Sequence, residues 1–98
     1  MTAYNLVRYR VKAGMEKDFL AAHARMKDAV PKGLRKGSLI KTGERAYCFV
    51  GEWDAMGSIA AARAQMIAIL DTMRAMLEDL GSGLGVTDPV SGDAVVEF

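Results

Sequence analysis

The spacing of apolar residues along this chain alternates between a period of two and a period near 3.6, and the order of these changes constrains the fold. Tyr4–Val11 alternate in the manner of a strand, and a helical stripe follows over about Met15–Ala29. Leu34–Thr42 and Ala46–Trp53 are two further predicted strands, and the short turn Gly43–Arg45 joins them as a hairpin. The chain therefore begins in the order strand, helix, strand, strand.

A second helical stripe follows and has the strongest periodicity of the chain. It is expected to begin after Asp54 as the N-cap, to extend to about Leu80 and to be closed by Gly81–Gly83. Turn signals come next, and Val95–Phe98 form a candidate last strand. The apolar stripe of the second helix consists of Met56, Ile59, Ala60, Met66, Ile67, Leu70, Met73 and Leu77.

This order predicts a single ferredoxin-like α+β domain over residues 1–98, with the layout βαββαβ. A four-stranded antiparallel sheet would carry both helices on one face, and residues 84–98 would form a C-terminal tail with the last strand. Side chains such as Leu6 and Val50 are apolar on the face that the helices leave open. We therefore expect a homodimer in which a second copy covers that face.

Cysteine content and hydropathy limit where the protein works. Cys48 is the only cysteine, so no intrachain disulfide can form, which favours a reducing cytoplasm. Met1–Lys12 lack the apolar core of a signal peptide, and no run approaches the ~20 apolar residues of a membrane span. We expect a soluble, unprocessed, cytoplasmic protein with no membrane partner.

Charge is distributed unevenly although the net charge is only +1. Residues 1–45 contain 11 Lys and Arg against 4 Asp and Glu, whereas residues 46–98 contain 2 against 8. The basic segment Arg25–Lys36 could be a patch for a polyanion. No aromatic residues interleave with it as base stacking needs, so we expect no nucleic acid. Attraction between the two halves, within a protomer or across a dimer, is the preferred interpretation.

Two short motifs carry a resemblance to known proteins. One is Val7–Gly14 with Glu16 and Phe19 after it, and the other is Gly51–Asp54 with a helix after it. The pattern resembles the dimeric α+β barrel superfamily, in particular its antibiotic-biosynthesis monooxygenase-like group, over about residues 4–75. The resemblance implies two sheets facing each other in a dimer and a pocket between sheet and helices in each protomer. It also implies activities such as cofactor-free oxygenation of aromatic polyketides and quinols, or heme degradation.

The heme-degrading branch of this group uses three residues that can be compared with the sequence. They are an Asn on the first strand, a Trp at the end of the third and a His on the second helix. The Trp position matches Trp53, whereas the Asn position falls on Val7 and the His position falls close to Arg63. Without an axial His the iron has no evident ligand, so we expect no cofactor and no metal site.

Arg63 is the residue that departs from the apolar pattern of the second helix. A guanidinium that faces a core is costly unless a group pairs with it. One interpretation is a catalytic anion clamp for a carboxylate, phenolate or enolate, which would also stabilise charge on oxygen during proton abstraction or oxygenation. The other is a structural ion pair, or a side chain that reaches solvent.

Five other residues complete the candidate site. His23, the only histidine, is either a catalytic general base or a boundary residue of the first helix. Trp53 is either a core aromatic or a pocket wall that stacks on an aromatic ligand. Tyr47 and Tyr9 could donate phenolic hydrogen bonds or belong to the core, and Met66 is adaptable core or pocket lining.

Together these residues predict a small-molecule-binding dimeric barrel for a small anionic or aromatic ligand. The enzymatic interpretation is a cofactor-independent monooxygenase acting on an aromatic, phenolic or quinol substrate. The alternative is a non-catalytic ligand-binding or regulatory module that uses the same pocket. A third interpretation is a structural assembly domain whose core is filled and has no ligand pocket.

Overall fold

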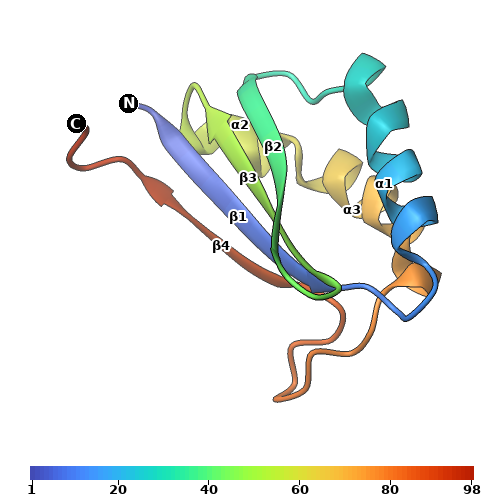
Figure 1. The fold of residues 1–98 in the computed structure, drawn as a ribbon. Coiled ribbons are helices and arrows are strands. Elements are labelled where there is room, and N and C mark those ends of the chain that lie inside the picture. The colour runs from blue at the N-terminus through green and yellow to red at the C-terminus, as the bar shows by residue number, and fades with distance from the viewer.

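The computed structural model describes residues 1–98 and shows a four-stranded antiparallel sheet with its helices on one face (Figure 1). The strands are β1 (Ala3–Arg10), β2 (Leu34–Gly43), β3 (Ala46–Trp53) and β4 (Asp88–Asp93), in the spatial order β2-β3-β1-β4. The helices are α1 (Glu16–Arg25), α2 (Met56–Ala61) and α3 (Arg63–Asp71), and two 3₁₀ turns are η1 (Met26–Asp28) and η2 (Arg74–Met76). The ferredoxin-like βαββαβ prediction is confirmed.

The pairing of β1 with its neighbours decides which side chains face the helices. β1 lies between β3 and β4, and its register places Asn5 opposite Gly51 of β3. Because side chains alternate along a strand, Val7 and Tyr9 point to the same side as Asn5. Trp53, at the end of β3, also points to this side, so the helices cover the aromatic face of the sheet.

Two buried clusters hold the helices on this face. Trp53, Phe19 and Val11 are the largest side chains with no exposed surface, and burying each contributes about 1.5–3 kcal/mol. α3 lies between the clusters and contains no buried residue, so it is not packed tightly on the sheet. The first cluster is Val11, Phe19, Ala22, Tyr47, Met73 and Leu77, and the second is Ala3, Trp53, Ile59 and Ala62.

The second helix is shorter than the sequence predicts. Instead of one helix to about Leu80, the chain forms α2, α3 and η2. Beyond η2, Leu77 forms a β-bridge with Val11, and the backbone N–H of Glu78 donates to the carbonyl oxygen of Arg10 at 2.8 Å. These backbone groups cannot also bond within a helix, so the contact with the end of β1 terminates it. No helix has the length and apolarity needed to cross a membrane.

Both predicted ends of this helix also differ in detail. Asp54 is not the N-cap, because α2 begins one residue later, after Ala55. The Asp54 carboxylate instead accepts a hydrogen bond from the hydroxyl of Ser58. Gly81–Gly83 lies in a loop well beyond the helix and does not close it.

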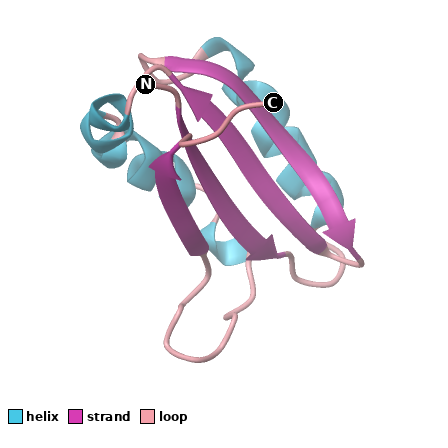
Figure 2. Cartoon of the chain, turned by 90° about the vertical axis from the view of Figure 1, so that its left-hand side faces the viewer, coloured by secondary structure: helices cyan, strands magenta, loops and turns pink.

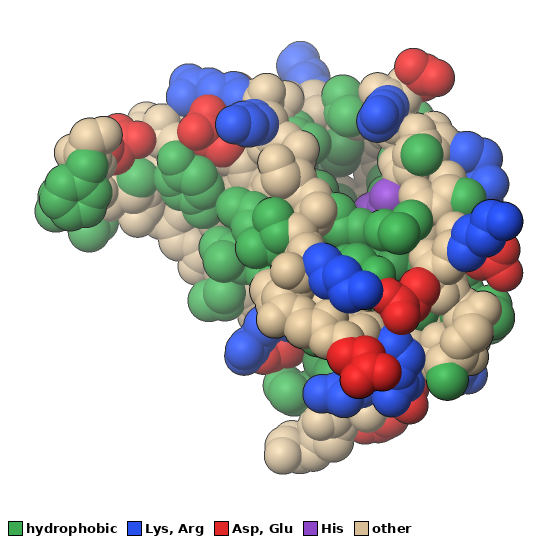
Figure 3. Space-filling view, in the orientation of Figure 1, with side chains coloured by type: hydrophobic (Ala, Val, Ile, Leu, Met, Phe, Trp, Pro, Cys, Tyr) green, Lys and Arg blue, Asp and Glu red, His purple; other side chains and the backbone are tan.

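The last strand lies earlier than the sequence predicts. Asp88–Asp93, where Pro89 and Gly92 indicate turns, pairs with β1, and Val95–Phe98 is not part of the sheet. Pro89 is tolerated because β4 is an edge strand with only one bonded neighbour. The tail beyond β4 leaves the sheet on the side away from the helices (Figure 1), and hydrophobic side chains gather at its tip (Figure 3).

No helix covers the opposite face of the sheet, and only the C-terminal tail crosses in front of part of it (Figure 2). Leu6, Ile40 and Val90 on this face are 37%, 46% and 62% exposed, and Leu6 has Val90 as its direct neighbour on β4. Arg8 crosses the same two strands and binds Asp88 at 2.6 Å. An exposed apolar face of this kind is typical of a protein–protein contact.

Candidate functional site

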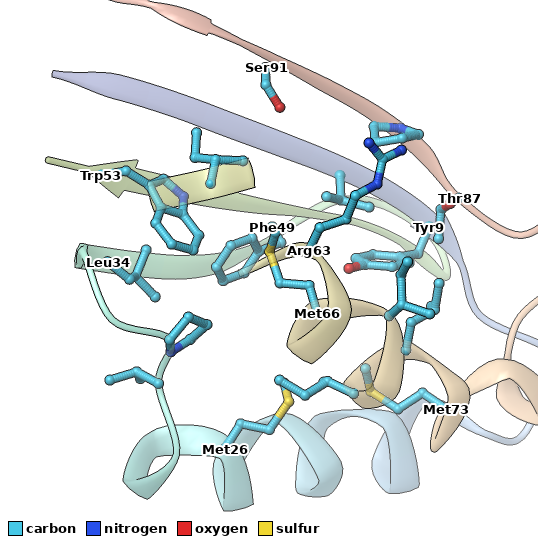
Figure 4. A pocket seen from close by; sticks show the side chains of 18 of the residues that line it. Tyr9, Met26, Leu34, Phe49, Trp53, Arg63, Met66, Met73, Thr87 and Ser91 are labelled. Carbon is cyan, nitrogen blue, oxygen red and sulfur yellow. The ribbon is translucent and has the colours of Figure 1, made fainter. Parts of the chain in front are cut away.

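A cavity of about 640 Å³ lies between the aromatic face of the sheet and the helices (Figure 4). This volume is in the range of sites for small molecules and cofactors. Phe49 and Leu34 line the sheet side near Trp53, whereas Met26 and Met73 line the helix side. Thioether side chains adapt to irregular shapes, so the helix side can adjust to a ligand.

Trp53 forms one end wall of this cavity and is fully buried. Its Nε1 donates a hydrogen bond of 2.6 Å to Oδ1 of Asn5, which is itself buried. A Cβ atom at Gly51 would clash with this Oδ1 and lie 2.8 Å from the indole Nε1. The strand glycine therefore leaves the space for the bond, and the bond fixes the indole ring.

Asn5 is the residue at this end of the cavity that the sequence analysis missed. The family resemblance assigns the asparagine position to Val7, but the asparagine in contact with Trp53 is two residues earlier on the same face. Asparagine is depleted in strands, so an Asn in the middle of a predicted strand is the sequence signal that could have identified Asn5. Arg63 lies close to the position that the resemblance assigns to the histidine, and a guanidinium does not ligate iron. The residues present do not fit the heme-degrading set.

Arg63 begins α3 and reaches over the cavity toward β4 (Figure 4). Its side chain is exposed, so the desolvation cost expected from its place in the apolar stripe does not arise. The guanidinium has no carboxylate partner, unlike Arg74, which also lines the cavity and binds Asp71 at 2.7 Å. Within the chain the guanidinium is in no ion pair and reaches solvent, so it is free to bind a ligand. The four ion pairs are Arg8–Asp88, Lys41–Glu16, Arg45–Glu78 and Arg74–Asp71.

Tyr9 lines the cavity from β1, and its hydroxyl points into the cavity (Figure 4). This hydroxyl has no hydrogen-bond partner within the protein. Every fully enclosed side-chain oxygen or nitrogen of the structure does have a partner, so the Tyr9 hydroxyl is not enclosed and opens to the cavity. Burial, with a smaller effect from the nearby Cys48, raises the pKa of Tyr9 to about 12. At neutral pH the phenol therefore keeps its proton and acts as a donor.

His23 lines the cavity from α1 and is half-buried. Its Nδ1 lies 3.0 Å from the carbonyl oxygen of Phe19. Because a carbonyl only accepts, Nδ1 carries the proton and Nε2 of the neutral ring stays unprotonated. Burial lowers the pKa of His23 from 6.5, although the bond to Phe19 acts in the opposite direction. The ring is held 4.4 Å from the ring of Phe19 and is neutral at pH 7, as a general base requires.

The two remaining predicted site residues lie in different places. Met66 lines the cavity from α3. Tyr47 is outside the cavity wall, since its ring packs 5.3 Å from that of Phe19 and its hydroxyl donates to Glu16. Lys41 donates to the same carboxylate at 3.2 Å. These bonds, that of Tyr47 first, lower the pKa of Glu16, and the Tyr47 hydroxyl is directed to this carboxylate and not to the cavity.

The fold is similar to solved structures over nearly the whole chain, although the sequence matches no protein-family model and no curated protein. SnoaB, a cofactor-independent oxygenase from Streptomyces nogalater, has a TM-score of 0.75 and 16% identity, and the match covers 98% of this chain and 95% of that one. Rv0793 from Mycobacterium tuberculosis has a TM-score of 0.78 and 9% identity, covering 99% and 98%. A structure of an antibiotic biosynthesis monooxygenase has a TM-score of 0.73 and 13% identity, covering 96% and 99%.

These similarities confirm, at the level of fold, the resemblance to antibiotic-biosynthesis monooxygenase-like proteins. Identities of 9% to 16% are too low to transfer a substrate or the role of a residue. The activity of this chain therefore has to be argued from its own cavity.

Proposed function

We propose that this protein is a small-molecule-binding dimeric barrel that acts as a cofactor-independent monooxygenase on an aromatic, phenolic or quinol substrate. The observation that carries the proposal is the presence of three polar groups without protein partners in one apolar cavity. They are the guanidinium of Arg63, the protonated hydroxyl of Tyr9 and the Nε2 of neutral His23. The same fold in a cofactor-independent oxygenase supports the reaction class.

Each of the three groups has a distinct role in this proposal. His23 Nε2 removes a proton from the substrate, which leaves an electron-rich carbanion. His23 is the only side chain lining the cavity that can act as a base at neutral pH. Arg63 stabilises the oxyanion that forms, and the Tyr9 hydroxyl donates a second hydrogen bond to it. Because the pKa of Tyr9 is about 12, this phenol does not serve as the base.

The overall reaction balances without an external reductant. A CH₂ group flanked by aromatic rings loses one proton to His23, and the resulting carbanion, stabilised as an enolate, forms a C–O bond with O₂. The peroxide takes up a proton and then loses water as the second C–H bond breaks. The product is a ketone, one oxygen atom of O₂ is in the new C=O group, and the other is in water.

A non-catalytic ligand-binding or regulatory module is the second candidate, and one observation favours it. Arg63 is exposed to solvent at the cavity mouth. Water around a guanidinium weakens its interaction with an oxyanion, and so lowers the transition-state stabilisation that it can provide. Binding a ligand requires a weaker interaction with Arg63 than stabilising the oxyanion of an oxygenation reaction does.

Oxygen uptake with an anthrone as the substrate distinguishes the two candidates. The experiment uses chelator-treated protein, and we expect one O₂ consumed for each anthrone converted. His23→Ala and Arg63→Ala should each lower the rate by about 10²-fold or more. Arg74→Ala is the matched control, because this arginine is already paired with Asp71. Anthrone binding without oxygen uptake would reject the monooxygenase and favour the module.

We also infer that the uncovered sheet face is the contact between two copies. β2 carries Arg35 and Lys36, whereas β4 and the tail carry Asp93 and Glu97, and none of the four is in an ion pair. β2 and β4 are opposite edges of the sheet, and none of the four side chains has an oppositely charged partner at ion-pair distance within the protomer. A copy that faces this sheet across a two-fold axis parallel to the strands brings the acidic edge of one protomer beside the basic edge of the other.

The cellular setting is inferred from the same features. Cys48 is free and buried, which agrees with a reducing cytoplasm, where we propose that the protein works. The exposed charges of Arg35 and Lys36 are assigned to the partner copy, so we propose no nucleic-acid partner. A stable monomer in solution at micromolar concentration would contradict the dimer.

A further inference from the structure

The polar side chains that line the cavity differ in how many of their donors are already bonded. The guanidinium of Arg74 is held by Asp71 at 2.7 Å, and both residues are exposed. The indole N–H of Trp53 is held by Asn5 at 2.6 Å. The one donor of Trp53 is used by Asn5, and the charge of Arg74 is matched by Asp71 through Nε, so neither is expected to select an anion as Arg63 does.

The donors of Arg63, Tyr9 and Thr87, which have no protein partner, lie together on the side of the cavity below β4, whereas Ser91 lies further along β4, opposite Asn5. Figure 4 shows Arg63 reaching from α3 toward β4, with the hydroxyl of Tyr9 below it and Thr87 next to Tyr9. The strand register agrees with this view. Arg8 pairs with Asp88, so the adjoining positions Tyr9 and Thr87 face each other across β1 and β4.

Apart from Arg74, whose charge is matched by Asp71, the rest of the cavity lining carries no permanent charge. Asp and Glu are absent from its lining, so a cationic ligand would find no partner. The opposite end is formed by Trp53, Phe49 and Leu34 (Figure 4). The hydroxyl near this end is that of Ser91, so an ionised group placed there would lose its hydration and find no cationic partner. The cavity therefore has one donor-rich side and one apolar end.

We propose that the cavity selects monoanionic ligands that carry one oxyanion, such as a carboxylate, sulfonate or enolate, on a flat apolar body. This inference rests on the proposed binding function and names its ligand class. The oxyanion lies between Arg63 and Tyr9, and the apolar body lies against Phe49 and Leu34, at the end of the cavity that the buried Trp53 closes. A single free guanidinium matches one negative charge and can donate two parallel N–H bonds to it. A dianion would keep one charge unmatched.

Two fluorescent dyes that differ by one charge test this inference. Anilinonaphthalene sulfonate has the required anion, and phenylnaphthylamine has the same rings without it. In wild-type protein we expect the sulfonate dye to bind at least about tenfold more tightly than the neutral dye. Arg63→Gln should raise the Kd of the sulfonate dye about tenfold and leave that of the neutral dye within about twofold. Arg63→Lys should keep part of the preference, because it retains the charge.

Two further variants sharpen the comparison. Arg74→Gln removes a positive charge from the same cavity wall, but from an arginine already paired with Asp71, and should leave both Kd values unchanged. Tyr9→Phe should raise the Kd of the sulfonate dye by about two- to tenfold and have little effect on the neutral dye. Circular dichroism establishes that each variant is folded, which we expect for Arg63 because its side chain is exposed and unpaired.

The outcomes separate this inference from the proposed function. Equal affinity of wild-type protein for the two dyes, or an unchanged sulfonate Kd in Arg63→Gln, would overturn the anion preference and leave the binding function in place. Failure of folded wild-type protein to bind either dye would overturn both. A loss of sulfonate binding in Arg74→Gln as large as in Arg63→Gln would show a general charge effect and overturn the assignment to Arg63.

Discussion

Trp53 and Asn5 are joined across β1 and β3 by a hydrogen bond of 2.6 Å from the indole Nε1 to the side-chain oxygen. Trp53 has no exposed surface and Asn5 is 5% exposed, so water cannot replace either partner. A buried donor without an acceptor is costly, which makes this bond a strong determinant of the ring position. The end wall of the cavity is therefore set by two strands, and not by the helices that cover it.

Replacing Asn5 should destabilise the protein measurably. Asn5→Ala leaves the indole N–H buried without an acceptor and should lower the free energy of unfolding by about 1–3 kcal/mol. Urea denaturation followed by fluorescence measures the change. Gln65→Ala is the control, because its hydrogen bond to the carbonyl of Ala29 is exposed and should contribute less than about 0.5 kcal/mol. Equal effects of the two substitutions would contradict this account of Asn5.

Adding a methyl group at Gly51 should be harmful, whereas the same change at Gly57 should not. A Cβ at Gly51 meets the Asn5 oxygen, the Trp53 indole nitrogen and the ring of Phe49. We expect Gly51→Ala to lower the free energy of unfolding by about 1–3 kcal/mol. At Gly57, an exposed position of α2, nothing lies within 4 Å of the added Cβ, and Gly57→Ala should raise the free energy of unfolding by about 0.5–1 kcal/mol. Thermal or urea unfolding of the two variants gives the comparison.

His23 predicts a pH dependence of stability with a definite sign. Burial lowers the pKa of this imidazole in the folded state below its ordinary value of 6.5. Between the two values the unfolded chain binds more protons, so stability is fully present above about pH 6.5 and falls as the pH drops through the folded-state pKa. Urea midpoints of wild type and His23→Gln between about pH 5 and pH 8 test this. The variant should lack this part of the slope, and parallel curves would refute it.

Charge-reversed variants test the proposed contact between copies. Arg35→Glu with Lys36→Glu gives one protein whose two sheet edges are both acidic, and Asp93→Lys with Glu97→Lys gives one whose edges are both basic. Each should dimerise more weakly than wild type at low salt, because like charges meet across the contact. A mixture of the two should form a mixed dimer, since acidic edges then face basic ones at both contacts. Sedimentation measures the masses, and wild-type dimerisation of each variant alone would contradict this arrangement.

The sequence predicts the fold well where the periodicity is strong. Ala46–Trp53 is found as the strand that its alternation indicates, and α1 with η1 occupies Glu16–Asp28, close to the expected range. Long-range pairing explains the main errors. The bridge between Leu77 and Val11 ends the second helix early, and β4 is an edge strand whose Pro89 hides it from a pattern search.

The candidate site is less predictable because it depends on contacts between elements. Arg63 stands out in a helical stripe, but its exposure depends on how far α3 lies from the sheet. Tyr47 and Tyr9 are equivalent in the strand pattern, and only the position of Glu16 on α1 places one hydroxyl outside the cavity. The Asn5–Trp53 bond requires the register of two strands that are distant in sequence.

The most direct test of the central claim, that the cavity beside Trp53 binds a small molecule, uses the fact that Trp53 is the only tryptophan. Its emission should change saturably as an anthrone is added, with one ligand for each protomer. Ala60→Phe, which fills the cavity from α2, should weaken this response at least about tenfold in a folded protein. A Trp53 emission that does not respond to ligand, or a response of equal strength in Ala60→Phe, would contradict the account.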